Sequence, residues 1–217
     1  MIANILRFIC KIIFRVQVKG LENVPEQDQL LIVANNESFL YGLLLGLFIP
    51  KRATFVVHSG VLKRWLFRQF LSLTPHLAVD PSSPMAIKKV VKRLKAGENV
   101  VIFPEGRITV TGALMKVYDG PGFIAARTGV NILPVRVEGA AQSYFGRLSS
   151  DHPRKLLPKV TLTVLPMTSI EVPKSTESQY ISNKQRRKMA GEKMQSIMQN
   201  ILFETHKKRT FFQAYLE

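Results

Sequence analysis

The apolar positions of the chain fall into short continuous runs separated by longer amphipathic stretches. The short runs have the length of strands, which are predicted at residues 29–34, 52–58, 99–103, 131–137 and 160–165. Helices are predicted from residue 38, over 62–72 and 86–96, and from about 178 to 206. Strands that alternate with helices predict an α/β fold: a single domain with a mixed, mostly parallel sheet flanked by helices.

Local signals add detail to two of these elements. Ser83 and Pro84 are typical of a helix start, with serine as the N-cap and proline at the first helical position. Gly97 is a natural end for the same helix. Pro134 lies inside the predicted strand 131–137, and because proline has no N–H to donate, it predicts an edge position or a bulge.

The segment 1–18 has the pattern of an amphipathic helix. Arg7, Lys11 and Arg15 are spaced by four, so a helix places them on one stripe and its isoleucines elsewhere. This pattern favours a helix in a membrane interface, with cations toward anionic head groups, over an ordinary helix packed on its own domain. The amphipathic segment around Trp65 is either a second interfacial anchor or a core-facing helix. No apolar run reaches the roughly 18 residues that a spanning helix needs.

Length and charge limit the kinds of protein that this chain can be. The 217 residues suit one domain, divided into the helix over 1–18, a core over 19–177 and a basic helical segment over 178–217. The 31 Lys and Arg exceed the 15 Asp and Glu, which gives a net charge of +16 and favours an anionic partner. Nucleic acid is not predicted as that partner, because the cations are dispersed among apolar helices and no nucleic-acid module is recognisable. The single cysteine, Cys10, excludes an internal disulfide and a cysteine-based metal site.

Candidate chemistry begins with the sequence Phe-Pro-Glu-Gly-Arg-Ile-Thr at residues 103–109. The block follows a predicted strand, and α/β sheets bind their ligands at the carboxyl ends of strands. Gly106 allows a sharp turn, and Arg107 has the planar fork that suits phosphate. Glu105 could hold that arginine or a substrate hydroxyl. The alternative is a solvated turn with an internal Glu–Arg pair.

A second block, Asn-Asn-Glu-Ser-Phe-Leu-Tyr-Gly at residues 35–42, lies where the first predicted strand gives way to a helix. Together with residues 103–109 and the Leu-Pro-Val of 133–135, it resembles the glycerolipid acyltransferase family of the lysophosphatidic-acid type. Within that family the chain is most similar to the N-terminal acyltransferase domain of bacterial bifunctional 2-acylglycerophosphoethanolamine acyltransferase/acyl-carrier-protein synthetases. The resemblance covers about residues 1–205.

The resemblance implies an activity and a set of partners. Members of this family transfer an acyl group from an acyl-carrier-protein or CoA thioester to a lysophospholipid hydroxyl at an anionic membrane surface, without cofactor or metal. The implied location is the cytoplasmic face of the bacterial cytoplasmic membrane, and the implied architecture continues into a C-terminal adenylate-forming domain. The resemblance assigns Arg107 to the glycerol-linked phosphate and Glu105 and Gly106 to the shape of that pocket. Arg52 is a weaker candidate for the same anion.

The chain departs from the family at the catalytic block. Asn36 occupies the slot of the family histidine, which takes the proton from the attacking hydroxyl, and Tyr41 occupies the slot of the aspartate that orients it. An amide has no basic nitrogen, a phenol is neutral near pH 7, and a lost base costs roughly 10²- to 10⁴-fold in rate. The sequence therefore predicts a lysolipid-binding domain that is inactive or severely impaired. The alternatives are an active enzyme with a non-standard base, for which His58 is a candidate, and a basic nucleic-acid-binding protein.

Overall fold

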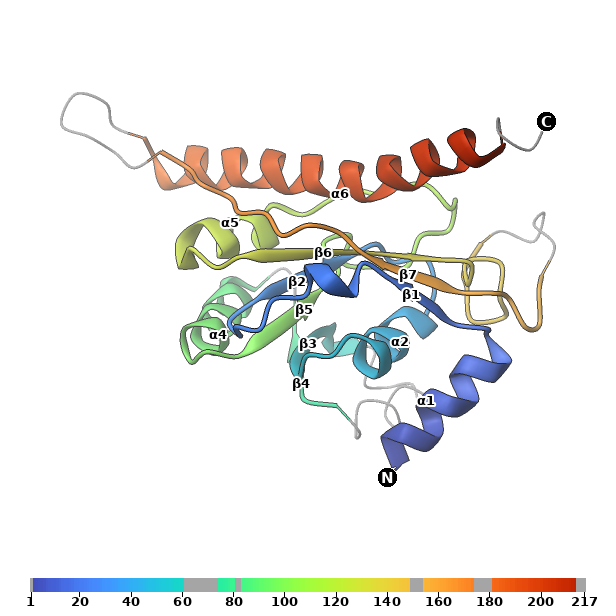
Figure 1. Ribbon diagram of the computed structural model, residues 1–217. Coiled ribbons are helices and arrows are strands. Elements are labelled where there is room, and N and C mark those ends of the chain that lie inside the picture. The colour runs from blue at the N-terminus through green and yellow to red at the C-terminus, as the bar shows by residue number, and fades with distance from the viewer. Residues whose placement is uncertain (1, 61–73, 81–82, 149–153, 174–180, 214–217) are drawn as a thin grey trace.

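One seven-stranded sheet organises the protein in the computed structural model shown in Figure 1. The structure describes residues 2–60, 74–80, 83–148, 154–173 and 181–213. The amphipathic segment predicted around Trp65 lies outside these residues.

The strand order is β1-β7-β6-β2-β5-β3-β4. The bounds are β1 (Gln17–Lys19), β2 (Leu31–Ala34), β3 (Ala53–His58), β4 (His76–Val79), β5 (Asn99–Ile102), β6 (Ile132–Glu138) and β7 (Thr161–Val164). Every neighbouring pair is parallel except β6 and β7, which are antiparallel. The predicted mixed, mostly parallel sheet is therefore confirmed. The two edge strands, β1 and β4, were not predicted.

Helices cover both faces of this sheet (Figure 1). They are α1 (Ile2–Ile13), α2 (Leu40–Phe48), α4 (Pro84–Lys95), α5 (Asp119–Thr128) and α6 (Asn183–Gln213), with a 3-10 turn η1 (Leu21–Asn23). Strand β2 is apolar on both sides, because its residues alternate between the two cores. Leu31 and Val33 pack with α4, α5 and α6, whereas Ile32 and Ala34 pack with α1 and α2.

The predicted limits of α4 are confirmed. The Ser83 hydroxyl accepts the Met85 N–H at 3.3 Å, Pro84 occupies the first turn, and Gly97 adopts a left-handed φ of 84° just beyond the last turn.

Helix α5 was not predicted, because Gly120, Pro121 and Gly122 are residue types that usually interrupt helices. The structure shows why they are tolerated. A Cβ on Gly122 would collide with the backbone carbonyl of Ala190 in α6, so glycine permits the close approach of the two helices. The predicted basic C-terminal helix is α6, and Met194 is among the buried residues that join it to the core.

Pro134 lies in β6, which pairs with β2 on one side and β7 on the other, so the predicted edge position is wrong. The alternative prediction of a bulge is confirmed. Val135 pairs with Val164, and Ile132 pairs with Thr168. Three residues of advance along β6 therefore correspond to four along the segment that follows β7, which leaves one extra residue in that segment. Proline fits here because the ladder is locally irregular.

Helix α1 has one packed face and one exposed apolar face. Cys10 and Phe14 are buried in the core, and the Arg7 side chain donates to the Leu47 carbonyl at the end of α2, 2.6 Å away. The exposed stripe of α1, as we call it, consists of Ile5, Phe8, Ile9, Ile12 and Ile13. At 100° per residue this stripe spans roughly 140° of the helix surface. In the described part of the chain, no helix combines the length and apolar character needed to cross a bilayer.

Candidate active site

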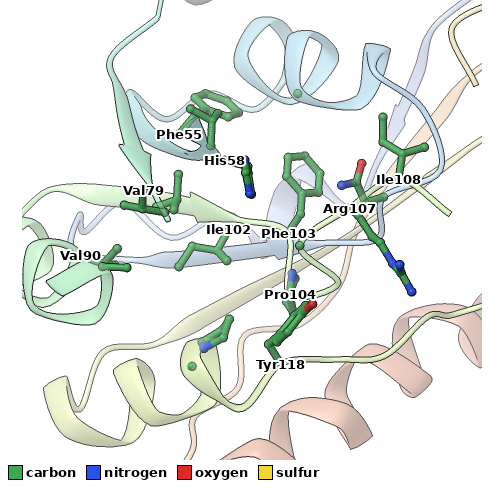
Figure 2. A pocket seen from close by; sticks show the side chains of 18 of the residues that line it. Phe55, His58, Val79, Val90, Ile102, Phe103, Pro104, Arg107, Ile108 and Tyr118 are labelled. Atoms are coloured by element: carbon green, nitrogen blue, oxygen red, sulfur yellow. The ribbon is translucent and has the colours of Figure 1, made fainter. Parts of the chain in front are cut away.

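A cavity of about 440 Å³ opens at the carboxyl edge of the parallel strands. It is bounded by the segments that follow β2 and β5, by the ends of β3 and β4, and by α4 and α5. Figure 2 shows Val79, Val90 and Ile102 toward one end of the cavity and Arg107 toward the other. The cavity therefore has an apolar chamber and a cationic mouth, which suits an amphiphile with an anionic head.

Asn36 lines this cavity, and both of its backbone polar groups are fixed by the block 103–109. Its N–H donates to Oε1 of Glu105 at 2.9 Å, and its carbonyl accepts the Thr109 N–H at 2.9 Å. The other carboxylate oxygen of Glu105 accepts the Met115 N–H at 2.9 Å. The two sequence blocks thus form one structural unit around position 36.

Glu105 links two segments of the chain through hydrogen bonds to their backbone. Its side chain is buried, which raises the pKa of the carboxyl above its ordinary value, while the two backbone N–H groups favour the ionised form. Both carboxylate oxygens are bonded to backbone, and Arg107 makes no ion pair with Glu105. The alternative of an internal Glu105–Arg107 pair is therefore wrong.

Gly106 turns the chain so that Arg107 reaches the cavity. Gly106 has a φ of 65°, and a Cβ there would lie 3.0 Å from the Tyr118 ring, so both conformation and space favour glycine. The exposed Arg107 side chain makes no hydrogen bond or ion pair with any residue that the structure describes. Its guanidinium, with no partner among these residues, is suited to bind an anion.

Two further arginines, Arg147 and Arg187, line the cavity, and sequence analysis missed both because neither belongs to a motif. Among the described residues that line it, none is Asp or Glu. As far as the described residues go, the mouth is therefore cationic, with no carboxylate to compensate.

Arg52 is not part of this site. It precedes β3 at the amino edge of the sheet, whereas the cavity lies at the carboxyl edge, about 20 Å away for a six-residue strand. Its carbonyl accepts a hydrogen bond from Asn99 at 3.0 Å. The structure therefore does not bring Arg52 to the predicted phosphate site.

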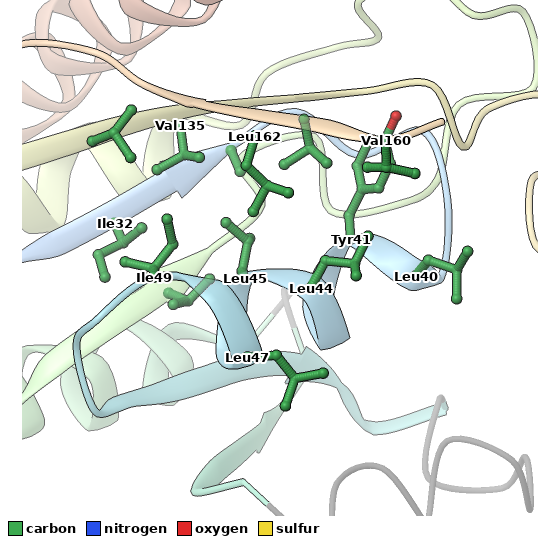
Figure 3. Packing of buried hydrophobic residues seen from close by; sticks show 14 of the residues in the cluster. Ile32, Leu40, Tyr41, Leu44, Leu45, Leu47, Ile49, Val135, Val160 and Leu162 are labelled. Atoms are coloured by element: carbon green, nitrogen blue, oxygen red, sulfur yellow. The ribbon is translucent and has the colours of Figure 1, made fainter. Parts of the chain in front are cut away.

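Tyr41 faces the core, away from the cavity. Figure 3 shows its side chain rising from α2 among the apolar residues of the core cluster, and its exposed fraction is 0%. Burial raises the pKa of the Tyr41 phenol well above 10, so the hydroxyl stays protonated near neutral pH. Of the two slots of the family dyad, Asn36 lines the cavity and Tyr41 is buried among the core residues.

The buried carboxylate of Glu37 accepts a hydrogen bond from the Tyr41 hydroxyl. Tyr41 donates to its Oε2 at 3.1 Å, while Arg136 at 2.7 Å and the Asn35 amide at 3.0 Å donate to its Oε1. Sequence analysis did not predict this network, because Glu37 and Arg136 are 99 residues apart. Glu37 does not line the cavity and is bonded to Arg136, so it is poorly suited to act as a base there.

His58 is the one imidazole among the described residues that line the cavity. It projects from the end of β3 toward the Ile102 and Phe103 side chains (Figure 2). Its Nδ1 accepts the Gly60 N–H at 2.9 Å, so the neutral ring carries its proton on Nε2. In this tautomer Nε2 is a hydrogen-bond donor rather than a base. Within the described residues, no group of three or more His, Cys, Asp or Glu is placed to hold a metal ion.

Comparison with known proteins agrees with this arrangement of blocks. The model of the family described as Acyltransferase matches residues 15–138, which is more than half of the chain. The chain belongs to the glycerolipid acyltransferase family, of the lysophosphatidic-acid type.

Two relatives in this family are 1-acyl-sn-glycerol-3-phosphate acyltransferases. The chloroplastic protein of Arabidopsis thaliana is 33% identical over 137 residues, which cover 59% of this chain and 37% of that protein. The protein of Pseudomonas aeruginosa is 34% identical over 131 residues, which cover 56% of this chain and 48% of that protein. The matches thus span less than half the length of these relatives.

A solved structure shows the same fold. It is the crystal structure of the 1-acyl-sn-glycerophosphate acyltransferase PlsC of Thermotoga maritima, with a TM-score of 0.60 and 20% sequence identity. The similarity covers 91% of this chain and 79% of that one. The predicted α/β fold is confirmed by this likeness.

Proposed function

We propose that this acyltransferase-family protein binds a lysophospholipid and that its acyl transfer is lost or severely impaired. The observation that carries the proposal is the position of Asn36, which is fixed at the cavity by Glu105 and Thr109. Arg107, which has no partner among the described residues, lines the same cavity. The frame of an acyltransferase site is present, and its base is missing. The relatives act, by their names, on acylglycerol phosphates, which supports a lysophospholipid as ligand. An acyl-carrier-protein or CoA thioester is the proposed acyl donor.

The polarity of the cavity supports a specific orientation of this ligand. Arg107 binds the phosphate through charge-assisted hydrogen bonds, and the chamber formed by residues such as Val79 and Ile102 receives an acyl chain. The glycerol hydroxyl then lies near Asn36, between the two ends.

Calorimetric titration with a lysophospholipid below its micellar concentration tests this binding mode. Arg107→Ala should weaken binding by about tenfold or more, since a charge-assisted bond contributes about 1.5–3 kcal/mol. Arg107→Lys should recover part of the loss, because it keeps the charge without the planar fork. Arg127→Ala is the matched control, since Arg127 is an exposed arginine of α5 that does not line the cavity. Equal affinity for Arg107→Ala and Arg127→Ala would contradict the proposal.

The second candidate function is an active enzyme that uses His58, and the place of its ring in the cavity favours it. The Gly60 N–H on Nδ1 opposes it, because a base at Nε2 requires the other tautomer. His58→Gln separates the two functions, with His76→Gln as control because His76 is an exposed histidine on the edge strand β4. Acyl transfer that is present in the unmodified protein and His76→Gln but absent in His58→Gln would establish the second function.

We further propose that the exposed stripe of α1 attaches the protein to the anionic cytoplasmic face of the bacterial cytoplasmic membrane. Five large apolar side chains on one helix face, with Lys11 beside them, have the composition of an interfacial helix. Deletion of 1–18 is an unsuitable test, because it removes buried core residues and most of β1. The paired change Phe8→Ser and Ile12→Ser leaves those in place and should weaken binding to phosphatidylglycerol vesicles. Unchanged binding by this folded variant would contradict the attachment.

A further inference from the structure

A second group of exposed apolar side chains lies in the connection between β6 and β7. Tyr144 is 67% exposed, Leu156 71% and Leu157 51%. We call these three residues the β6–β7 patch. The bridge between Ser143 and Lys155 places the segments that carry Tyr144 and Leu156 side by side. Exposed apolar side chains on adjoining segments commonly mark a surface that binds another apolar surface.

The backbone that carries the β6–β7 patch is held by a network of hydrogen bonds to Arg154 and Ser143. The Arg154 guanidinium donates to the carbonyls of Ser143 at 3.0 Å, Gly146 at 3.2 Å and Leu148 at 2.8 Å. The Ser143 hydroxyl in turn donates to the Ala140 carbonyl at 2.7 Å. The apolar side chains are therefore held toward solvent by a fixed backbone.

The same connection is joined to the end of α1. The Phe14 and Phe145 rings meet edge to face, with centroids 6.5 Å apart. Arg15 donates to the Leu157 carbonyl at 3.1 Å, and the Val160 N–H donates to the Phe14 carbonyl at 2.9 Å. Figure 1 shows α1 ending beside this connection. The exposed stripe of α1 and the β6–β7 patch are thus carried by segments that are bonded to each other.

The connection also reaches the mouth of the cavity. The Phe39 N–H donates to the Phe145 carbonyl at 3.0 Å, and the Arg147 guanidinium lies over the Phe39 ring, 5.8 Å from its centroid. Phe39 and Arg147 both line the cavity. The segment that carries Tyr144 therefore also forms part of the cavity mouth.

The charges around the β6–β7 patch indicate what kind of partner it binds. Residues 139–160 contain four Lys and Arg and one acidic residue, Asp151. Lys155 and Lys159 are exposed beside the apolar side chains, and Arg15 is exposed at the end of α1. Apolar side chains fringed by cations are complementary to an anionic lipid bilayer, which offers acyl chains beneath negative head groups.

We infer that the β6–β7 patch is a second contact with an anionic bilayer, and that with α1 it turns the cavity mouth toward the membrane surface. The inference rests on the proposed function, because it gives the lysolipid a route from the bilayer past Arg147 into the cavity. Two contacts on bonded segments fix the orientation of the domain on the membrane more tightly than a single interfacial helix does.

Depth-dependent quenching of a single tryptophan tests the inference. Trp65 is the only tryptophan, so Trp65→Phe provides the background for Leu156→Trp, with Tyr144→Trp as a second probe should the first not fold. Phe203→Trp is the matched control, because Phe203 is 65% exposed on α6, across the sheet from α1. On phosphatidylglycerol vesicles with brominated acyl chains, Leu156→Trp should be strongly quenched and blue-shifted, and Phe203→Trp should change little. Equal quenching of the two probes, or no vesicle binding by the Trp65→Phe protein, overturns the inference.

A loss-of-contact variant separates this inference from the proposed function. Replacing Tyr144, Leu156 and Leu157 with serine should lower vesicle partitioning by roughly tenfold or more. The affinity for a monomeric lysophospholipid, measured by calorimetry, should stay the same, because none of the three residues lines the cavity. Unchanged partitioning overturns the inference while leaving the lysolipid site intact. A spectral change of Leu156→Trp with acyl-carrier protein and none with vesicles also overturns it, in favour of a protein partner.

Discussion

Glu105 accepts the backbone N–H of Asn36 at 2.9 Å across 69 residues of sequence. This bond fixes position 36 at the cavity through the main chain, so its place does not depend on which side chain it carries. Binding and catalysis can therefore be lost separately. Under the proposed function, the asparagine removes the base, while the backbone contacts that position residue 36 remain.

The hydrogen bonds of Glu105 should be important for stability. Glu105→Ala removes the acceptor of the part-buried N–H groups of Asn36 and Met115, at a cost of about 1 kcal/mol for each. We expect a lower free energy of unfolding in urea and a weaker affinity for lysophospholipid. If Glu105→Ala unfolds at the same urea concentration as the unmodified protein, the hydrogen bonds of Glu105 contribute nothing to stability.

Restoring activity should require three changes. Asn36→His places an imidazole on the fixed backbone, and Tyr41→Asp supplies the carboxylate of the family dyad. The introduced aspartate would share a buried region with Glu37, whose carboxylate the Tyr41 hydroxyl contacts, and two neighbouring buried carboxylates disfavour ionisation of both. Adding Glu37→Gln removes this conflict and leaves Arg136 available as a partner for the aspartate.

The triple variant should therefore raise lysophospholipid acylation by at least ~10²-fold over the unmodified chain, and more than the double variant does. Melting curves recorded on the same samples show whether each variant is folded. A folded triple variant without acyl transfer would refute the proposal that Asn36 and Tyr41 account for an impaired activity.

The Arg136–Glu37 pair should be costly to break. Both side chains are buried, and removing one partner leaves an uncompensated charge, so Arg136→Met should lower stability by about 3–5 kcal/mol. The exposed Arg93–Glu98 pair is the matched control, and Arg93→Met should cost about 1 kcal/mol or less. Urea unfolding of both variants measures the difference. Equal costs would show that burial of the Arg136–Glu37 pair has no consequence.

Tyr41 should make stability depend on alkaline pH. Unfolded tyrosine loses its proton near pH 10, whereas the raised pKa of buried Tyr41 keeps it protonated in the folded state. The folded state then binds more protons, so the contribution of Tyr41 to stability is present below pH 10 and is lost as the pH rises above it. Between about pH 10 and 11, stability should fall less steeply for Tyr41→Phe, by up to ~1.4 kcal/mol per pH unit. Parallel curves would show that Tyr41 titrates normally in the folded protein.

Sequence patterns located the strands that are buried on both faces and missed those with weaker signals. Strands β2 and β5 are fully buried, so their apolar runs are continuous. Strands β1 and β4 are three- and four-residue edge strands with half-exposed side chains, which leaves little pattern to detect. Helix α5 was missed because the same glycines that permit close packing on α6 obscure its helical pattern.

The order of the motifs predicted which residues lie together at the site. The direction in which each side chain points could be seen only in the structure. Asn36, Glu105 and Arg107 were predicted from the two blocks. The direction of Tyr41 and its bond to Glu37 depend on the distant residue Arg136, which no local pattern reveals. Arg52 was a candidate from its sequence position, but the direction of β3 places it at the opposite edge of the sheet from the cavity.

The most direct test of the central claim is a single-turnover assay of the unmodified protein with a lysophospholipid and an acyl-carrier-protein or CoA thioester. The account predicts bound lysolipid and a rate of acyl transfer at least ~10²-fold below that of the variant Asn36→His, Glu37→Gln, Tyr41→Asp. Acyl transfer by the unmodified protein at the rate of that triple variant would contradict it.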